Sequence, residues 1–282
     1  ADMGDLFVAR DPLRVAARLR RAPRHGGTPL RAIVSVVMLL VSLAALGMLT
    51  MVREEIAAQA QAPTAHVNPL HLCRSVEAAH APGAIVVGDG GELANVFVYL
   101  NPGRGKKLEV HPDVKPADKP LVLDNHGCRF EPHAMTVWTA DKFEIRNSDE
   151  GIGHNTNASM LFANPKFNEQ VTNGAPIVKQ FTKSESYPSK VACNVHPWMN
   201  AYVLIRDNPY MAVSAADGTF EIKNVPAGKH DFAFWHEAKG NLKDLKVGKD
   251  KADRKGQLAI DVPAGKTVDL GVIEITPALL GK

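Results

Sequence analysis

The feature that most restricts the fold of this 282-residue chain is an uncharged apolar run at 32–52, AIVSVVMLLVSLAALGMLTMV. About 20 consecutive apolar residues span the hydrocarbon core of a bilayer as a helix. The run is longer than the core of a signal peptide, about 7–15 residues, and an arginine-rich segment precedes it. We therefore expect a transmembrane helix. A cleaved leader ending at AQAQA (58–62) and a buried core helix are the alternatives.

The charges around this run predict its orientation. Residues 1–31 carry seven arginines against three aspartates, whereas the rest of the chain carries 26 basic and 27 acidic residues. Positive charge stays on the cytoplasmic side of a membrane helix. We expect a single pass through a bacterial inner membrane, with a cytoplasmic basic tail at 1–31 and the remainder in the periplasm. Nucleic acid is not an expected partner, because that needs a basic face on the folded part.

The remainder of the chain has the pattern of a β protein. Residues 53–83 predict a linker, since APTAHVNP breaks any continuation of the helix. After it come short alternating apolar runs, such as NVFVYL and KFEIRN, bounded by Gly, Pro, Asn or Asp. Several such strands without a convincing helix predict an antiparallel sandwich or barrel at 84–206. The turn signals AADGTF and VPAGKH predict a second small β-sandwich at 207–282.

The stretch CNVHPWM places Cys193, His196 and Met199 within one short loop. A thiolate, two imidazoles and a weak axial thioether form the trigonal site that holds blue copper. The second imidazole must come from another strand, and His154 follows a predicted strand and a polar turn. We expect Asn155, next to it, to tie that loop to the ligand loop by hydrogen bonds.

The pair FEIRNSDEGIGHN and CNVHPWM resembles the cupredoxins, and the short C-x-x-H-x-x-M loop with proline after the histidine is similar to amicyanin. The resemblance covers about 84–206 and implies a Greek-key β-sandwich with a type 1 copper site. It implies that His154, Cys193 and His196 are the strong ligands and Met199 the weak axial one. It also implies single-electron exchange with a redox protein partner.

Other interpretations of these residues stay open. A lone cysteine on a strand is often a small buried hydrophobe, and Met199 can be a core residue. Zinc also binds Cys and His, although methionine is not a natural zinc ligand. The site can also be present but empty or vestigial. Trp198, inside the ligand loop, either forms an apolar collar where a partner docks or simply packs.

The other two of the three cysteines are Cys73 and Cys128. Outside the cytoplasm an even pair is expected to form a disulfide. That pairing leaves Cys193 as the odd thiol, in agreement with a metal-binding role. The alternative pairings would consume the sulfur of Cys193 and compete directly with copper.

The C-terminal range carries no recognisable chemistry. Its G-x-F-x-I and VPAG pattern resembles carboxypeptidase-regulatory-like or transthyretin-like β-sandwich modules, which implies a structural role. The chain also has no His-x-His pair, of the kind that the further coppers of copper enzymes use, and no nucleophile elbow or phosphate loop. We do not expect an enzyme.

Two functions from different classes follow from these features. The first is a membrane-anchored periplasmic electron carrier with a type 1 copper site. The second is a structural accessory subunit of a photosynthetic or respiratory membrane complex, in which the helix and tail bind neighbouring subunits and the copper site is empty. Copper delivery is a weaker third, because the chain has no Met-rich or His-rich tract.

Overall fold

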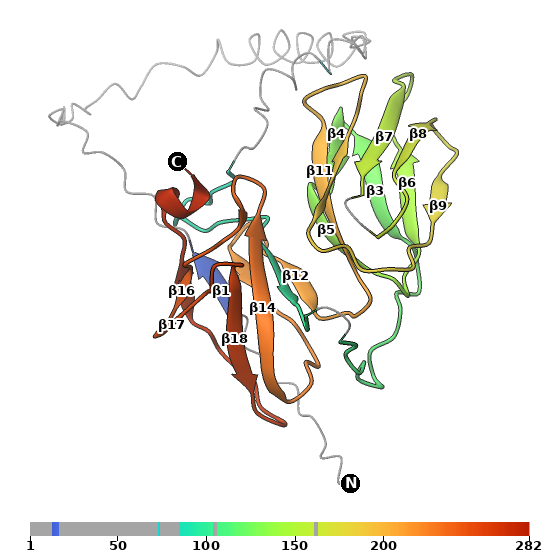
Figure 1. The fold of residues 1–282 in the computed structure, drawn as a ribbon. Coiled ribbons are helices and arrows are strands. Elements are labelled where there is room, and N and C mark those ends of the chain that lie inside the picture. The colour runs from blue at the N-terminus through green and yellow to red at the C-terminus, as the bar shows by residue number, and fades with distance from the viewer. Residues whose placement is uncertain (1–12, 17–72, 74–84, 104–105, 161–162, 282) are drawn as a thin grey trace, which may run out of the picture. The chain divides into compact units, whose positions relative to one another are not determined.

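The computed structural model describes residues 13–16, 73, 85–103, 106–160 and 163–281 (Figure 1). In this part of the chain the secondary structure is 19 β-strands and one 3-10 helix, η1 (Pro277–Leu280), so the prediction of a mainly β chain is confirmed. Among these residues no helix is long and apolar enough to cross a membrane. The predicted helix at 32–52 lies outside the described residues, as do most of the predicted tail and linker.

Two sheets form the first β-sandwich (Figure 1). Leu123 and Ile145 from one sheet and Val203 from the other share one core, and each is at most 1% exposed. Each sheet contains one parallel pair, which needs a crossover connection, so the sandwich is mixed and not purely antiparallel as the sequence predicts. In order, the sheets are β5 (Ala134–Trp138), β11 (Asn200–Arg206), β10 (Ser189–Ala192), β7 (His154–Ser159), β8 (Phe167–Val171); and β4 (Arg129–Glu131), β3 (Leu121–His126), β6 (Phe143–Asn147), β9 (Ile177–Lys179).

Strand β11 is apolar on both of its faces. Val203 and Ile205 face the core of the first sandwich, whereas Leu204 packs in a separate cluster with Phe97 and Trp235. A strand buried on both sides has a continuous apolar run instead of strict alternation, which explains AYVLI. This strand follows the CNVHPWM loop directly, so the C-terminal end of the loop is fixed by a buried strand.

The second group of strands has its own core and includes one strand that the sequence predicts elsewhere. Strand β2 (Phe97–Leu100) lies in the range 84–206, but it pairs with β12 (Met211–Val213) and β14 (Gly228–His236). Its four residues are at most 1% exposed, so it needs a neighbour on each side, and these neighbours lie beyond residue 206. By hydrogen bonding β2 therefore belongs to the C-terminal sheet. That sheet also contains β15 (Gly240–Asn241) and β18 (Gln257–Val262).

A third sheet includes residues from the predicted N-terminal tail. Strand β1 (Leu13–Ala16) pairs with β13 (Thr219–Phe220) and with β19 (Val272–Glu274) through its backbone. A bilayer core cannot separate paired backbone groups, so these strands lie on one side of any membrane. The pairing concerns four residues of the predicted tail, and the cytoplasmic location of 1–31 stays a prediction. A two-stranded sheet, β16 (Lys246–Val247) and β17 (Asp250–Lys251), completes the fold.

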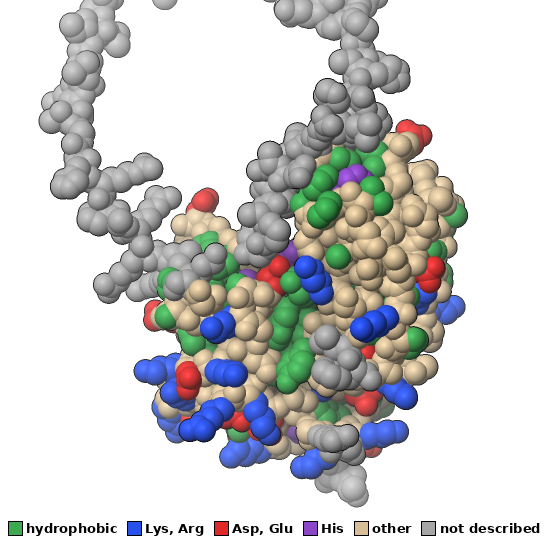
Figure 2. Space-filling view, turned by 45° about the horizontal axis from the view of Figure 1, so that its top comes forward, with side chains coloured by type: hydrophobic (Ala, Val, Ile, Leu, Met, Phe, Trp, Pro, Cys, Tyr) green, Lys and Arg blue, Asp and Glu red, His purple; other side chains and the backbone are tan. Residues whose placement is uncertain are grey.

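The described surface carries both signs of charge. On the face shown in Figure 2, Lys and Arg side chains lie among Asp and Glu side chains. This mixture agrees with the near balance of basic and acidic residues after residue 31.

Candidate metal centre

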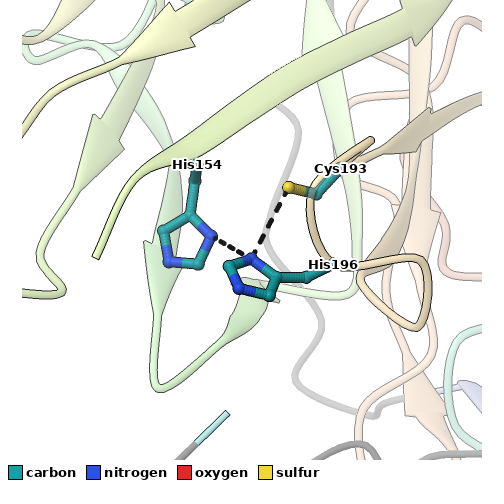
Figure 3. Close-up of side chains that lie close together, drawn as sticks. All are labelled: His154, Cys193 and His196. Atoms are coloured by element: carbon teal, nitrogen blue, oxygen red, sulfur yellow. Dashed lines mark hydrogen bonds between the residues drawn. The ribbon is translucent and has the colours of Figure 1, made fainter. Parts of the chain in front are cut away.

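Two neighbouring strands bring the predicted ligands together. His154 is the first residue of β7, and Cys193 follows the last residue of β10, which pairs with β7 through Ala192 and Asn157. His196 lies in the loop between β10 and β11. Figure 3 shows the three side chains converging on one point. The adjacency of β7 and β10 thus places residues 39 positions apart at one site.

The ligand atoms form a compact, buried group. The Nδ1 atoms of His154 and His196 are 3.0 Å apart, and the Nδ1 atom of His196 is 3.9 Å from the Sγ atom of Cys193. All three ligand atoms lie within 4.8 Å of one another. The residues are 0%, 7% and 2% exposed for His154, His196 and Cys193. One sulfur and two imidazole nitrogens at this spacing can share a single metal ion.

Backbone hydrogen bonds close the ligand loop around Met199. The N–H of Cys193 donates to the carbonyl of Met199 at 3.2 Å, and the N–H of Met199 donates to the carbonyl of His196 at 2.9 Å. The Met199 side chain is 1% exposed and packs in the same core as Cys193. Its role as an axial ligand stays a prediction.

Asn155 joins the two ligand-bearing segments. Its Oδ1 atom accepts the N–H of Asn194 at 2.7 Å and the thiol of Cys193 at 3.4 Å. Its Nδ2 group donates to Asn168 on β8 at 2.6 Å, which fixes the amide orientation. Asn155 therefore holds the cysteine end of the ligand loop against β7, as the sequence predicts.

Asp149 is a site residue that the sequence analysis missed. Its Oδ2 atom lies 2.9 Å from the Nε2 atom of His154, and the carboxyl is buried. The carboxylate accepts a hydrogen bond from the Nε2–H group of His154, so the Nδ1 atom of this imidazole is left as the ligand atom. The carboxylate five residues before His154 was the available signal.

Burial and hydrogen bonding act in opposite directions on the acid–base groups of the site. Burial lowers the pKa of His154, but Asp149 and Cys193 raise it to about 9. Burial raises the pKa of Cys193, but hydrogen bonds from His154 and from nearby backbone N–H groups outweigh it and hold the pKa below its usual value. The pKa of His196 is lowered by burial and by the charge of His154. The site thus favours the thiolate, which is the form that binds metals.

The donor set fits copper. Two imidazole nitrogens face each other at 3.0 Å beside the sulfur of Cys193, an arrangement that needs a proton or a cation between the nitrogen lone pairs. A soft sulfur with two imidazoles suits copper, and it suits zinc less when the fourth donor is a thioether. His154, Cys193 and His196 would hold the ion.

Trp198 and the disulfide lie beside this group. Cys73 and Cys128 form a disulfide with a Cα–Cα distance of 5.2 Å, the pairing that the sequence predicts, and Cys193 is a free buried thiol. The ring of Trp198 lies 5.1 Å from the ring of His196, centroid to centroid. Trp198 is partly buried against Cys73 and Cys128, so it packs as well as borders the site.

Replacing Asn155 with alanine is expected to destabilise the metal-free chain by roughly 1–3 kcal/mol, because the N–H of Asn194 loses its acceptor. Asn157 is the matched control, since it is on the same strand and contacts Asn194 only by an exposed side-chain hydrogen bond of 3.1 Å. We expect Asn157→Ala to cost less than about 0.5 kcal/mol. Denaturant unfolding measures both, and equal losses would show that Asn155 has no special role in the loop.

Neither a protein-family model nor a curated protein sequence matches the chain. Among solved structures it is similar to a Cu-containing nitrite reductase from Thermus scotoductus SA-01, at 17% identity and a TM-score of 0.28, over 37% of this chain and 25% of that chain. It is also similar to a reduced Cu(I) form of an amicyanin variant, at 20% identity and a TM-score of 0.27, over 32% of this chain and 85% of that chain. An oxidised amicyanin variant has 18% identity and a TM-score of 0.28, over 34% of this chain and 90% of that chain. At these values the function has to be inferred from the site itself.

Proposed function

We propose that the chain is an electron-transfer protein that holds one copper ion in a type 1 site. The observation that carries this proposal is the convergence of one thiol sulfur and two imidazole Nδ1 atoms in a buried group within 4.8 Å. Copper bound there supplies a one-electron Cu(II)/Cu(I) couple. Cys193, His154 and His196 would be the strong ligands, and Met199 the weak axial ligand.

The surroundings of the ligands suit a carrier. A site that changes little between two oxidation states needs ligands that do not move. Here Asp149 holds His154, Asn155 holds the cysteine end of the loop, and backbone hydrogen bonds close the loop. His196 is the most exposed of the three ligands, and its neighbour Val195 is 56% exposed. We propose that a redox protein partner approaches the site from this side.

Single-electron transfer is a better match than catalysis. An enzyme of this donor chemistry needs a place for substrate at the metal or a further metal. In the part of the chain that the structure describes, the other metal-compatible group is Cys128, Asp149 and His154, and its sulfur is in the disulfide. We therefore propose a carrier and not an enzyme.

We further propose that residues 32–52 anchor the chain in a bacterial inner membrane, with the sandwiches in the periplasm, where a disulfide persists. The partners would then include other subunits of a membrane complex. An N-terminal tag that is protected from protease in spheroplasts supports the single pass, and an accessible tag contradicts it.

The direct test of the copper site is the optical and EPR spectrum of the purified full-length chain titrated with Cu(II). We expect an intense visible thiolate-to-copper band, a small copper hyperfine splitting and a stoichiometry of one ion. A chain that stays colourless and binds no copper stoichiometrically would refute the carrier. The accessory-subunit function, with an empty site, would then be the better account.

A further inference from the structure

The disulfide cysteine Cys128 lies in a two-residue hairpin turn and has a positive φ. The pair Gly127 and Cys128 joins β3 to β4, with φ values of 58° and 57°. A two-residue hairpin turn of this kind needs positive φ at both central residues, and residues such as Asn and Gly are the usual choice. Cysteine in this conformation is uncommon. The turn is covered, because Cys128 is 0% exposed and its partner Cys73 is 2% exposed.

One side of this turn reaches His154. The carboxylate of Asp149 accepts the N–H of Gly127 at 2.6 Å and the N–H of Cys128 at 2.8 Å. The same Oδ2 atom that accepts from Cys128 lies 2.9 Å from the Nε2 atom of His154. The position of this imidazole therefore depends on a carboxylate whose own position depends on the turn.

The other side of the turn reaches His196. The carbonyl of Cys128 accepts the indole N–H of Trp198 at 3.1 Å. The indole ring in turn lies 5.1 Å from the imidazole of His196, with an interplanar angle of 55°. Cys73, Cys128 and Trp198 also belong to one small apolar cluster. The N–H of Cys128 is thus connected to His154 through Asp149, and its carbonyl is connected to His196 through Trp198.

We infer that the disulfide-closed turn at Gly127 and Cys128 is a positioning element of the metal centre, which orients His154 through Asp149 and His196 through Trp198. This inference rests on the proposed copper function for its metal readouts but not for its readout in the metal-free chain. Residues that orient metal ligands typically change metal affinity by about 10–100-fold when they are replaced. A disulfide that only restrains the unfolded chain would change stability and leave the imidazoles as they are.

The first test uses the metal-free full-length chain labelled with ¹⁵N-histidine. The variant is Cys73→Ser/Cys128→Ser, which leaves Cys193 as the only thiol. The Nε2 proton of His154, assigned with His154→Gln, should be protected in the parent chain, because the residue is 0% exposed and bonded to Asp149. We expect its exchange with water to accelerate about tenfold or more in the variant, while core amides such as Ile145 keep their protection. Unchanged protection of the His154 proton would overturn the inference.

The second test is a double-mutant cycle on metal affinity, with Cu(II) and Co(II) as probes. Asp149→Asn alone is expected to weaken binding about 10–100-fold. In the Cys73→Ser/Cys128→Ser background the same substitution should have a clearly smaller effect, because the turn no longer holds the carboxylate in place. Asp141→Asn is the matched control: this carboxylate is also buried, but it accepts the N–H of Ala117 at 2.8 Å instead of a group at the metal centre. Additive effects would contradict the inference.

Trp198→Phe tests the second connection and keeps the disulfide. It removes the donor to Cys128 and retains an aromatic ring beside His196. We expect weaker metal binding without faster exchange at His154, since the two connections leave Cys128 by different backbone groups. If the double serine variant does not fold, this variant still decides, because unchanged affinity would refute the role of the turn at His196. If no metal binds at all, the proposed function fails, and the exchange of the His154 proton still tests the turn.

Discussion

Replacing Cys193 with alanine is expected to abolish the visible thiolate-to-copper band and to weaken Cu(II) binding by more than about 100-fold. The loss should exceed the 10–100-fold typical of residues that only orient ligands, because a ligand atom itself is removed. No other thiolate can replace it, since Cys73 and Cys128 are joined in a disulfide. Optical titration and EPR of the full-length chain measure both effects.

Cys193→Ser is the matched control for this experiment. The hydroxyl has nearly the size of the thiol, so packing in the core is retained, but oxygen is a harder donor than sulfur. We expect this variant to bind Cu(II) through His154 and His196 without the intense band. A Cys193→Ala variant that keeps the band would show that another sulfur binds copper. Equal copper affinity in all three chains would show that the converging residues are not a metal site.

The ligand loop was predictable from the sequence because its members are close in the chain. Cys193, His196 and Met199 lie within seven consecutive residues, so one loop can place all three side chains close together. This grouping can be predicted without knowing which strands are neighbours in the fold. His154 could be added because the second imidazole ligand must come from another strand, and His154 follows a predicted strand and a polar turn. The structure places three of these four residues in one group of ligand atoms.

Asp149 could not be predicted in the same way. A carboxylate near a histidine in a polar turn is common, and its contact with His154 depends on the shape of another turn at residues 127 and 128. The partners of β2 escaped prediction for a related reason. Alternation and burial show which side chains face inward, but they do not specify which strand is the neighbour. Phe97–Leu100 therefore looks the same in either sheet until its hydrogen bonds are known.

Replacing Phe234 with alanine is expected to destabilise the C-terminal sheet by about 3–5 kcal/mol. Its side chain is 0% exposed in a core that contains Val98 of β2 and Leu258 of β18, and it is the register partner of Val98. The reason is the lost burial of an aromatic ring together with the cavity that remains. Denaturant unfolding of the full-length chain measures the loss. Val178→Ala, at a side chain that is 54% exposed on β9, is the control and should stay within about 0.5 kcal/mol.

Hydrogen exchange in the Phe234→Ala variant also tests where β2 belongs. Since β2 is bonded to β14 and β12, its amides should lose protection together with those of β14. The amides of β7 and β10 pair with each other in the first sandwich and should keep theirs, and the visible copper band should persist. If β14 opens while Val98 stays protected, β2 is held by the first sandwich, as the predicted range 84–206 implies, and β2 does not pair with β14.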